Sequence, residues 1–409
     1  MSGENFDGNR FVSGAFAKGA CAAVTRVPPT DGVGPLGPCI VVDDPLEALQ
    51  AFAAYHRRRY AVPVVALTGS CGKTMAKDVT AALLASRYRV VKTQGNLNNA
   101  IGCPLSLLEI GDETEIAVIE MGANHAGEIA AMCDVARPTD SAITMVAPAH
   151  LEGFGTIERV AEAKAEIVEA LPAEGTFYVN NDDPWCRRAA ERHAGRTVSF
   201  GREGDVALKE CRVDESGEMQ LTIEPVGTLR LPLVCEAHAT NVLLAVAVGI
   251  EHGITDVEAP LRAAVPGLSR FRLLQIGQIE IIDDTYNANP ASMAAALDTL
   301  ARRPVQGARI AALGEMLELG AAAGELHRQV GTQAGEAGVT HLYARGPHGG
   351  EMSEAARAAG VAHAAVIEDH DAIAEVIRTV AVPGSCLLVK GSRGMAMERV
   401  IEALQRRKP

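Results

Sequence analysis

The sequence predicts an α/β protein in three parts. The central domain has a parallel sheet with a phosphate-binding loop and a small antiparallel patch. A Rossmann-like α/β domain follows at the C-terminus, and a short α/β domain precedes the central domain at the N-terminus. Three observations support this prediction. Short β-rich runs alternate with Ala-rich stretches of helical spacing, which is typical of a parallel sheet flanked by helices. Between residues 198 and 234 the runs follow one another with turn residues and no helix, which indicates antiparallel strands. A second α/β series begins near residue 269.

The elements follow in chain order within three predicted ranges. In residues 1–60, "ACAAVTRV" and "PCIVVDD" are expected strands and "DPLEALQAFAAYHRRR" an expected helix, which is too little for a complete doubly wound domain and indicates a truncated one. In residues 61–268, the parallel strands are "VPVVALTG", "RYRVVKT", "EIAVIEMG", "SAITMVAP" and "GTFYVNND". The antiparallel patch comprises "VSFG", "ALKECRVDE", "MQLTIEP" and "TLRLPLV", and a helix near 238–252 and a turn-rich "VPGLSRFR" follow it. In residues 269–409, the strands are "IEIIDDTY", "ARIAALG", "HLYARG", "HAAVIED" and "SCLLVKGS".

Composition excludes several kinds of partner. The 409 residues hold 38 Lys and Arg against 51 Asp and Glu, so no basic surface is expected for nucleic acid or an anionic membrane, and small molecules are the expected partners. No apolar run is long enough to span a membrane, and "MSGENFDGNRF" lacks the order of a signal peptide, so we expect a cytoplasmic protein. The nine cysteines form no C-x-x-C pair, and we expect reduced thiols that lie mostly in the core.

Residues 66–84, "ALTGSCGKTMAKDVTAALL", place a short G-x-x-G-K-T loop between a strand and a helix. The loop has two residues between its glycines, where the familiar phosphate-binding loop has four, and it still provides backbone N–H groups, a lysine for the β and γ oxygens, and a hydroxyl for Mg²⁺. A glycine-rich turn is the alternative, and the flanking strand and helix disfavour it. The predicted ATP-binding residues here are Gly69, Ser70, Cys71, Gly72, Lys73 and Thr74.

Two further side chains follow predicted strands at the edge where α/β proteins bind ligands. Glu120 ends "IAVIEMG" and His150 follows the next strand in "MVAPAHLEGFGT". A carboxylate suits Mg²⁺, and a histidine beside it indicates a second, less usual metal position. Taken singly, Glu120 reads equally well as a helix-capping carboxylate and His150 as a surface loop residue. A phosphate-binding loop alone leaves kinase, GTPase and ligase open.

Seven segments together resemble the Mur ligase family from about Phe6 to the C-terminus. They are "TGSCGKT", "KTQGNLNNAIGCPLSLL", "EMGANHAGEI", "APAHLEGFGTIERVAEAKAEI", "DDTYNANPASM", "LGEMLELG" and "VKGSRGMAMERV". "DDTYNANP", "NLNN" and "KGSR" resemble the branch of the family that adds D-alanyl-D-alanine, and they distinguish this chain from amino-acid-adding members and from folylpolyglutamate synthase.

The resemblance implies ATP-driven amide formation with Mg²⁺, on a monomer, in peptidoglycan precursor synthesis. The carboxylate of UDP-N-acetylmuramoyl-tripeptide would attack the γ-phosphate to give an acyl phosphate and ADP, and the amine of D-alanyl-D-alanine would then displace phosphate. Cations must neutralise the charge that grows during this transfer. The family's metal ligands match Thr74, Glu120, His150 and Lys164, the last as a carbamylated lysine, although an unmodified Lys164 would be an ordinary surface lysine. The implied catalytic residues are Lys73, Glu120, His150, Lys164 and Arg270.

The resemblance also assigns residues around the nucleotide and the peptide. Arg270 matches an arginine that reaches the ATP phosphates. The segment expected along the ribose and adenine contains Asp284, Tyr286, Asn287 and Asn289, although "NANP" alone reads as a turn. The residues expected to hold the substrates are Asn96, Asn98, Asn99, Lys390, Ser392 and Arg393.

Three departures from the family pattern are visible. Met75 replaces a threonine after the loop, and catalysis is expected to survive this change. "CEAHATN" only partly matches the family's G-x-H-N pattern, with Asn241 at the helix start. The chain begins after the segment that holds the UDP-sugar in relatives, which indicates either a misplaced start codon or altered UDP recognition. Two other functions stay open: a folylpolyglutamate-synthase-like ligase, and a nucleotide-binding protein without catalysis.

Overall fold

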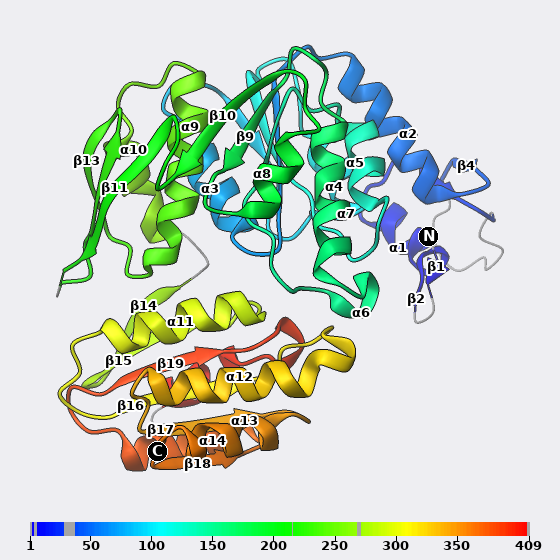
Figure 1. Ribbon diagram of the computed structural model, residues 1–409. Coiled ribbons are helices and arrows are strands. Elements are labelled where there is room, and N and C mark those ends of the chain that lie inside the picture. The colour runs from blue at the N-terminus through cyan, green and yellow to red at the C-terminus, as the bar shows by residue number, and fades with distance from the viewer. Residues whose placement is uncertain (1, 4–5, 28–36, 215, 268–270, 407–409) are drawn as a thin grey trace.

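The computed structural model describes residues 2–3, 6–27, 37–214, 216–267 and 271–406. Two large sheets, each flanked by helices, form the upper and lower halves of the molecule in Figure 1, and a small N-terminal part lies against the upper half. The mixed α/β fold that the sequence predicts is confirmed. Among the described residues, every helix is too short or too polar to cross a membrane.

The N-terminal part consists of two small sheets and a short helix. β1 (Ser2–Gly3) and β2 (Phe6–Asp7) pair antiparallel, and β3 (Ala23–Thr25) and β4 (Cys39–Val41) pair parallel. α1 (Val12–Ala17) lies between these two pairs along the chain. The two strands expected from "ACAAVTRV" and "PCIVVDD" are therefore confirmed.

The upper sheet has nine strands in the order β13-β12-β11-β10-β9-β8-β5-β7-β6. The strands are β5 (Val64–Thr68), β6 (Val90–Lys92), β7 (Ile116–Glu120), β8 (Asp140–Ile143), β9 (Thr176–Asn180), β10 (Arg196–Gly201), β11 (Val206–Val213), β12 (Met219–Glu224) and β13 (Gly227–Leu231). The antiparallel patch is confirmed for β11 to β13. The expectation that "VSFG" belongs to this patch is wrong, because β10 runs parallel to both β9 and β11 and so continues the parallel sheet.

Helices cover both faces of this sheet because its central strands are apolar on both sides. β5 is buried at all five positions. One face packs against α3 (Lys73–Leu84), α9 (Ala239–Glu251) and α10 (Glu258–Ala264). The other face packs against α4 (Gly102–Leu108), α5 (Glu128–Ala136), α7 (Ile157–Glu169) and α8 (Pro184–Ala190).

Helix α2 (Pro45–Arg58) joins the N-terminal part to the upper half. Asp44 begins the helix, since its carboxylate accepts the N–H of Leu46 at 2.6 Å and Pro45 occupies the first turn. The helix contacts α4 and α5, and Ala53 is buried in the same core as these helices. Residues 45–58 therefore pack with the large sheet, although they lie in the range expected for the N-terminal domain.

The lower sheet has the order β14-β15-β19-β16-β17-β18. The strands are β14 (Arg272–Ile276), β15 (Ile279–Asp284), β16 (Arg309–Gly314), β17 (His341–Arg345), β18 (His363–Val366) and β19 (Cys386–Lys390). One face packs against α11 (Pro290–Arg302), α12 (Ala323–Glu336) and α13 (Gly349–Ala358), and the other against α14 (His370–Val380) and α15 (Glu398–Gln405). β14 is not among the strands predicted from the sequence, because it starts inside the expected turn "VPGLSRFR"; it pairs antiparallel with β15.

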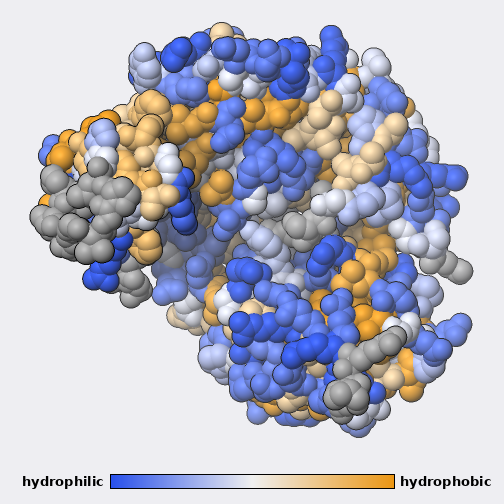
Figure 2. Space-filling view, turned by 180° about the vertical axis from the view of Figure 1, so that it is seen from behind, coloured by the Kyte–Doolittle hydropathy of each residue, from blue (hydrophilic) through white to orange (hydrophobic). Residues whose placement is uncertain are grey.

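All nine cysteines are free thiols, as expected, and five of them are buried. Figure 2, which views the molecule from behind, shows the surface hollowed between the N-terminal part and the two larger halves.

Candidate active site

A cleft of about 1080 Å³ lies between the two halves and takes its walls from both. Most of the residues singled out in the sequence line it: Ser70, Cys71, Gly72, Lys73, Thr74, Asn96, Asn98, Asn99, Glu120, His150, Asp284, Tyr286, Asn287, Asn289, Lys390 and Arg393. Gly69, Lys164 and Ser392 are not among the residues that line the cleft, and Arg270 lies outside the described residues. The cleft therefore brings together segments that lie far apart in the sequence, such as Ser70 and Lys390, which are 320 positions apart.

The two glycines of the loop have a steric reason to be glycine. Gly69 has φ +144° and Gly72 has φ +84°, which are unfavourable for residues with a Cβ. A Cβ on Gly69 would lie 2.0 Å from Oγ1 of Thr144, and a Cβ on Gly72 would lie 2.5 Å from Oδ1 of Asn241. Asn241 thus packs directly against the loop at the start of α9.

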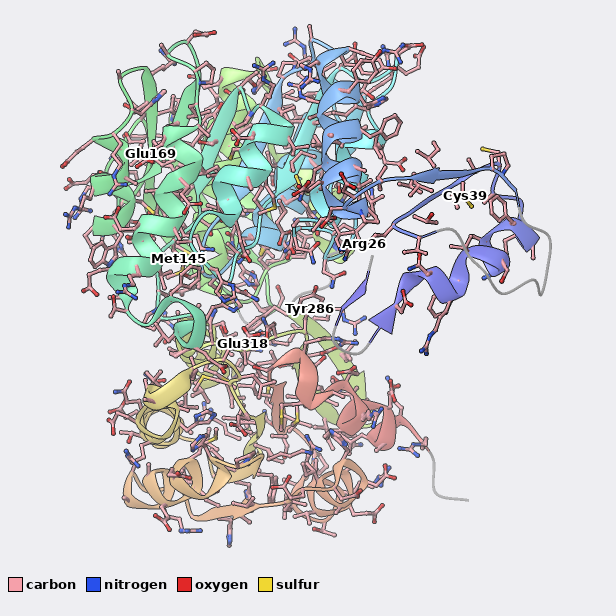
Figure 3. The ribbon with its side chains drawn as sticks, turned by 90° about the vertical axis from the view of Figure 1, so that its right-hand side faces the viewer. Arg26, Cys39, Met145, Glu169, Tyr286 and Glu318 are labelled. Carbon is pink, nitrogen blue, oxygen red and sulfur yellow. The ribbon has the colours of Figure 1, made fainter. Side chains whose placement is uncertain are left out.

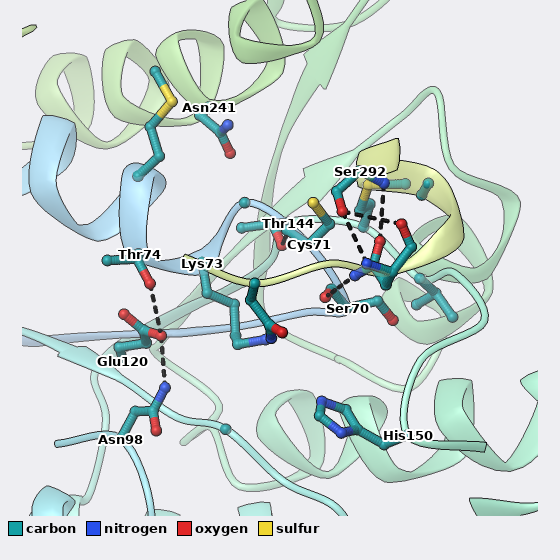
Figure 4. Close-up of a pocket in the computed structure, with 18 of the residues that line it drawn as sticks. Ser70, Cys71, Lys73, Thr74, Asn98, Glu120, Thr144, His150, Asn241 and Ser292 are labelled. Atoms are coloured by element: carbon teal, nitrogen blue, oxygen red, sulfur yellow. Dashed lines mark hydrogen bonds between the residues drawn. The ribbon is translucent and has the colours of Figure 1, made fainter. Parts of the chain in front are cut away.

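The loop is held in place by the segment that follows β8. The N–H of Ser70 donates to the carbonyl oxygen of Met145 at 2.8 Å, and its hydroxyl donates to the carbonyl oxygen of Ala147 at 2.8 Å. The Thr144 hydroxyl donates to the carbonyl oxygen of Cys71 at 2.5 Å. Lys73 adds a contact within the loop itself, because its Nζ donates to the carbonyl oxygen of Gly69 at 2.6 Å. This ammonium therefore lies across the mouth of the loop (Figure 4).

Glu120 provides a buried anion at the end of β7. Its Oε1 accepts from the hydroxyl of Thr74 at 3.3 Å and from Nδ2 of Asn98 at 2.7 Å, as Figure 4 shows. The side chain is only 1 % exposed, and its Oε2 has no hydrogen-bond partner among the described residues. A buried carboxylate oxygen without a partner is unfavourable unless a cation or a ligand completes it.

A divalent cation fits this position. Thr74 and Glu120 offer the hard oxygen ligands that Mg²⁺ prefers. Within the described part of the chain, no group of three His, Cys, Asp or Glu side chains could hold a metal ion by itself. A cation here would therefore depend on further oxygens from a bound phosphate, which is the usual mode for Mg²⁺.

His150 and Lys164 lie on the α6 and α7 side of the cleft. His150 precedes α6 (Leu151–Phe154) with φ +52°, and its Nδ1 contacts Oε2 of Glu318 in the lower half. Burial lowers the pKa of His150, and the carboxylate of Glu318 partly opposes this shift.

Lys164 is 1 % exposed, and its Nζ donates to the carbonyl oxygen of Ala123 at 3.4 Å and lies 5.6 Å from the ring centre of Phe154. Burial, with a smaller effect of Lys73, lowers the pKa of Lys164 to about 7. Lys164 is therefore no ordinary surface lysine, which was the alternative interpretation of the sequence.

The lower half contributes a segment that is tied to the start of α11. The Oδ1 of Asn289 accepts the N–H of Ser292 at 2.9 Å and caps the helix, while its Nδ2 donates to the carbonyl oxygen of Ser70 at 3.2 Å. The Nζ of Lys390 contacts Oδ2 of Asp284 and donates to the carbonyl oxygen of Asn287 at 2.9 Å. Lys390, expected to bind substrate, is thus engaged inside the protein in this structure, where it holds the Asp284 segment beside the loop.

Three other predicted substrate residues also have partners within the chain. The hydroxyl of Ser392 accepts the N–H of Leu317 at 2.9 Å. Arg393 pairs with Glu398 at 3.0 Å with a largely exposed side chain. Oδ1 of Asn99 accepts the N–H of Gly102 at 2.9 Å, which orients the start of α4.

Several residues of the cleft were not predicted as site residues from the sequence. Asp182 and Trp185 line it just after β9, so the signal that identified Glu120, a polar residue at the end of a parallel strand, would also have found Asp182. Glu318 lies in "LGEMLELG", a segment that resembles the Mur ligase family but contains no predicted site residue. Its contact with His150 joins positions 168 residues apart, and no local pattern indicates it.

A phosphate-binding loop, a buried carboxylate and a second α/β domain that faces them define a nucleotide-dependent enzyme of the ligase type. The Mur ligase middle domain matches residues 67–249, and the Mur ligase, glutamate ligase domain matches residues 269–393. The chain belongs to the Mur ligase family.

Three relatives illustrate the similarity. The UDP-N-acetylmuramoyl-tripeptide--D-alanyl-D-alanine ligase of Escherichia coli is 36% identical over 99% of this chain and 90% of its own length. MurF from Acinetobacter baumannii superimposes with a TM-score of 0.89 at 31% identity, over 100% of this chain and 90% of that one. The MurF ligase from Thermotoga maritima in complex with ADP gives a TM-score of 0.85 at 29% identity, over 99% and 93% of the two chains.

Proposed function

We propose that this chain is an ATP-dependent amide ligase that joins D-alanyl-D-alanine to UDP-N-acetylmuramoyl-tripeptide in peptidoglycan precursor synthesis. The observation that carries the proposal is the single cleft in which the loop at Ser70, the buried Glu120 and the start of α11 meet. Full-length relatives with this activity in their names support the choice of substrates. We place the reaction in the cytoplasm, and we assign residues 1–60, 61–268 and 269–409 to its three domains.

The chain's own residues account for the handling of phosphate. Lys73 lies across the loop, where its ammonium can neutralise charge on the β and γ oxygens as the substrate carboxylate attacks the γ-phosphate. The N–H groups at the start of α3 add positive potential at the same place. Asn98 is bonded to Glu120, so it can orient a group on the substrate beside the same anion.

Two positions are proposed for Mg²⁺. Thr74 and Glu120 would hold one ion, and His150 with carbamylated Lys164 would hold a second. When bound, Mg²⁺ would supply charge neutralisation between the phosphates and the acyl group. The unpartnered Oε2 of Glu120 supports the first position, and the lowered pKa of Lys164 supports the second, since only a neutral amine reacts with CO₂.

A phosphate-release assay tests the proposal. The protein is incubated with ATP, Mg²⁺ and UDP-N-acetylmuramoyl-tripeptide, with and without D-alanyl-D-alanine, and with a folate and glutamate as the competing pair. We expect phosphate release and amide product only with the complete first set. Release with the folate pair would favour the folylpolyglutamate-synthase-like alternative. ATP binding without release in any mixture would favour a non-catalytic protein.

A further inference from the structure

The two halves of the molecule also touch through Glu318 and His150, away from Asn289 and the loop. Glu318 lies in the turn after β16, and its side chain reaches Nδ1 of His150, which precedes α6 in the upper half. The carbonyl oxygen of Glu318 also accepts the N–H of Glu152 at 3.1 Å. Figure 3 shows Glu318 at the junction of the two halves.

This contact determines which nitrogen of His150 carries the proton. An ionised carboxylate only accepts hydrogen bonds, so Nδ1 must donate. In a neutral imidazole the other nitrogen, Nε2, then has the free lone pair. Histidines that bind metals or act in catalysis are commonly oriented in this way by a carboxylate on the opposite ring nitrogen.

The backbone supports the same geometry on both sides. His150 has φ +52° and Glu318 has φ +64°, and both are residues for which left-handed backbone is unfavourable. The fold therefore holds two strained positions opposite each other, together with a backbone hydrogen bond that does not depend on either side chain.

We propose that Glu318 is a positioning residue that reaches across from the C-terminal half and holds His150 as the Nδ1–H tautomer, with Nε2 as its reactive nitrogen. The inference rests on the proposed function, in which His150 belongs to the phosphate and metal site. His150 then acquires its working tautomer only when the two halves meet as they do here. The contact couples the arrangement of the halves to the chemistry in the cleft.

A purely structural ion pair is the alternative. Both side chains are partly exposed, 27% for His150 and 49% for Glu318, and such pairs contribute little to stability. Removing the side chain of Glu318 leaves the hydrogen bond from Glu152 to the backbone of residue 318 in place. The positioning effect can therefore be separated from the docking of the two halves.

The test compares Glu318→Ala and Glu318→Gln with the parent, and uses Glu336→Gln as the matched control. Glu336 is exposed at the end of α12, so its substitution makes the same change of charge in the same half. Nitrogen-15 NMR of histidine-labelled, nucleotide-free protein reports the tautomer of His150, and His150→Gln identifies the signal. Phosphate release with the full substrate set gives kcat and the KM for ATP.

We expect the Nδ1–H tautomer in the parent and the control, and its loss in Glu318→Ala. In the same variant kcat falls by about 10- to 100-fold while the KM for ATP stays close to the parent value. Glu318→Gln keeps an acceptor oxygen, so it retains more of the tautomer and of kcat than the alanine variant does.

Two results would overturn the inference: an unchanged tautomer in Glu318→Ala, or a kcat close to that of the parent despite a changed tautomer. If the alanine variant unfolds, Glu318→Leu, which has a side chain of similar size but no acceptor oxygen, decides by the same two measurements. A different outcome would refute the proposed function instead: Glu318→Ala changes the tautomer of His150, but the parent releases no phosphate with any substrate.

Discussion

Replacing Lys164 by methionine should stabilise the protein and abolish its activity. Lys164 is 1 % exposed and has one long hydrogen bond to a carbonyl oxygen, so its charged form is poorly solvated. Burial lowers its pKa from 10.5 to about 7. At about 1.4 kcal/mol for each pH unit, this difference corresponds to at most about 5 kcal/mol of lost folding free energy when the amine is charged. Methionine has a similar length and no charge, so Lys164→Met removes this cost.

The sign of the pH dependence follows from the lowered pKa. Between pH 7 and pH 10.5 the unfolded chain binds more protons at Lys164 than the folded chain does, so the stability of the parent rises with pH in this window. Below pH 7 Lys164 is charged in both states, so the full free-energy cost of burying the charged amine is present. We therefore expect the free energy of unfolding of Lys164→Met to exceed that of the parent by a few kcal/mol near pH 6. The advantage should shrink as pH rises toward 10.5.

Urea unfolding at pH 6 and at pH 9, in buffer depleted of CO₂, measures this difference. Phosphate release measures the other half of the prediction, since a methionine cannot form a carbamate. In Lys164→Ala the shortened side chain leaves space, and a high concentration of bicarbonate or a short carboxylate should restore part of the activity. Equal stability of parent and Lys164→Met near pH 6, or a fully active Lys164→Ala with no response to carboxylate, would refute the reasoning.

Three other predictions follow from the loop and its contacts. Lys73→Ala should lower phosphate release on the order of 10²-fold or more, because nothing replaces the charge at the phosphate oxygens, and activity within a few-fold of the parent would contradict its role. Gly72→Ala should lower the melting temperature and weaken ATP binding in a calorimetric titration, since φ is +84° and the new Cβ would meet Asn241 at 2.5 Å; an unchanged titration would show that the loop adapts. Asn289→Ala should lose about 1 kcal/mol of helix capping, whereas Asn289→Asp keeps the cap and loses only the donor to Ser70. Unfolding curves should separate these two variants, and ATP affinities should fall in both; an aspartate variant with parent affinity would rule out the contact with Ser70.

Much of the fold was predictable because its signals are local. The strand before Gly69 and the helix after it follow from periodicity, and an apolar run such as β5 indicates a strand that is covered on both faces. The strand β14 was missed for a local reason as well. It starts at Arg272 inside a turn-rich stretch, and it can be recognised as a strand only from its antiparallel pairing with β15.

The site was predictable as a set of segments but only partly as a set of contacts. The motifs indicated that Lys390 and Asp284 belong to one site, yet their direct contact joins positions 106 residues apart. A lysine that follows a strand has the same local sequence whether it faces a ligand or a buried carboxylate. The contact of Glu318 with His150 was beyond prediction for the same reason, because it depends on how two independent domains meet.

The tethering of the loop at Ser70 bears on how fast a nucleotide can bind. The N–H and the hydroxyl of Ser70 both bond to the segment after β8, so the loop holds its shape without help from a phosphate. A loop that is already ordered loses little conformational entropy on binding, and more of each contact energy is retained as affinity. Association should then resemble the encounter of two rigid bodies, with a rate constant set by diffusion and charge. Differences in affinity between nucleotides should therefore come mostly from their dissociation rates.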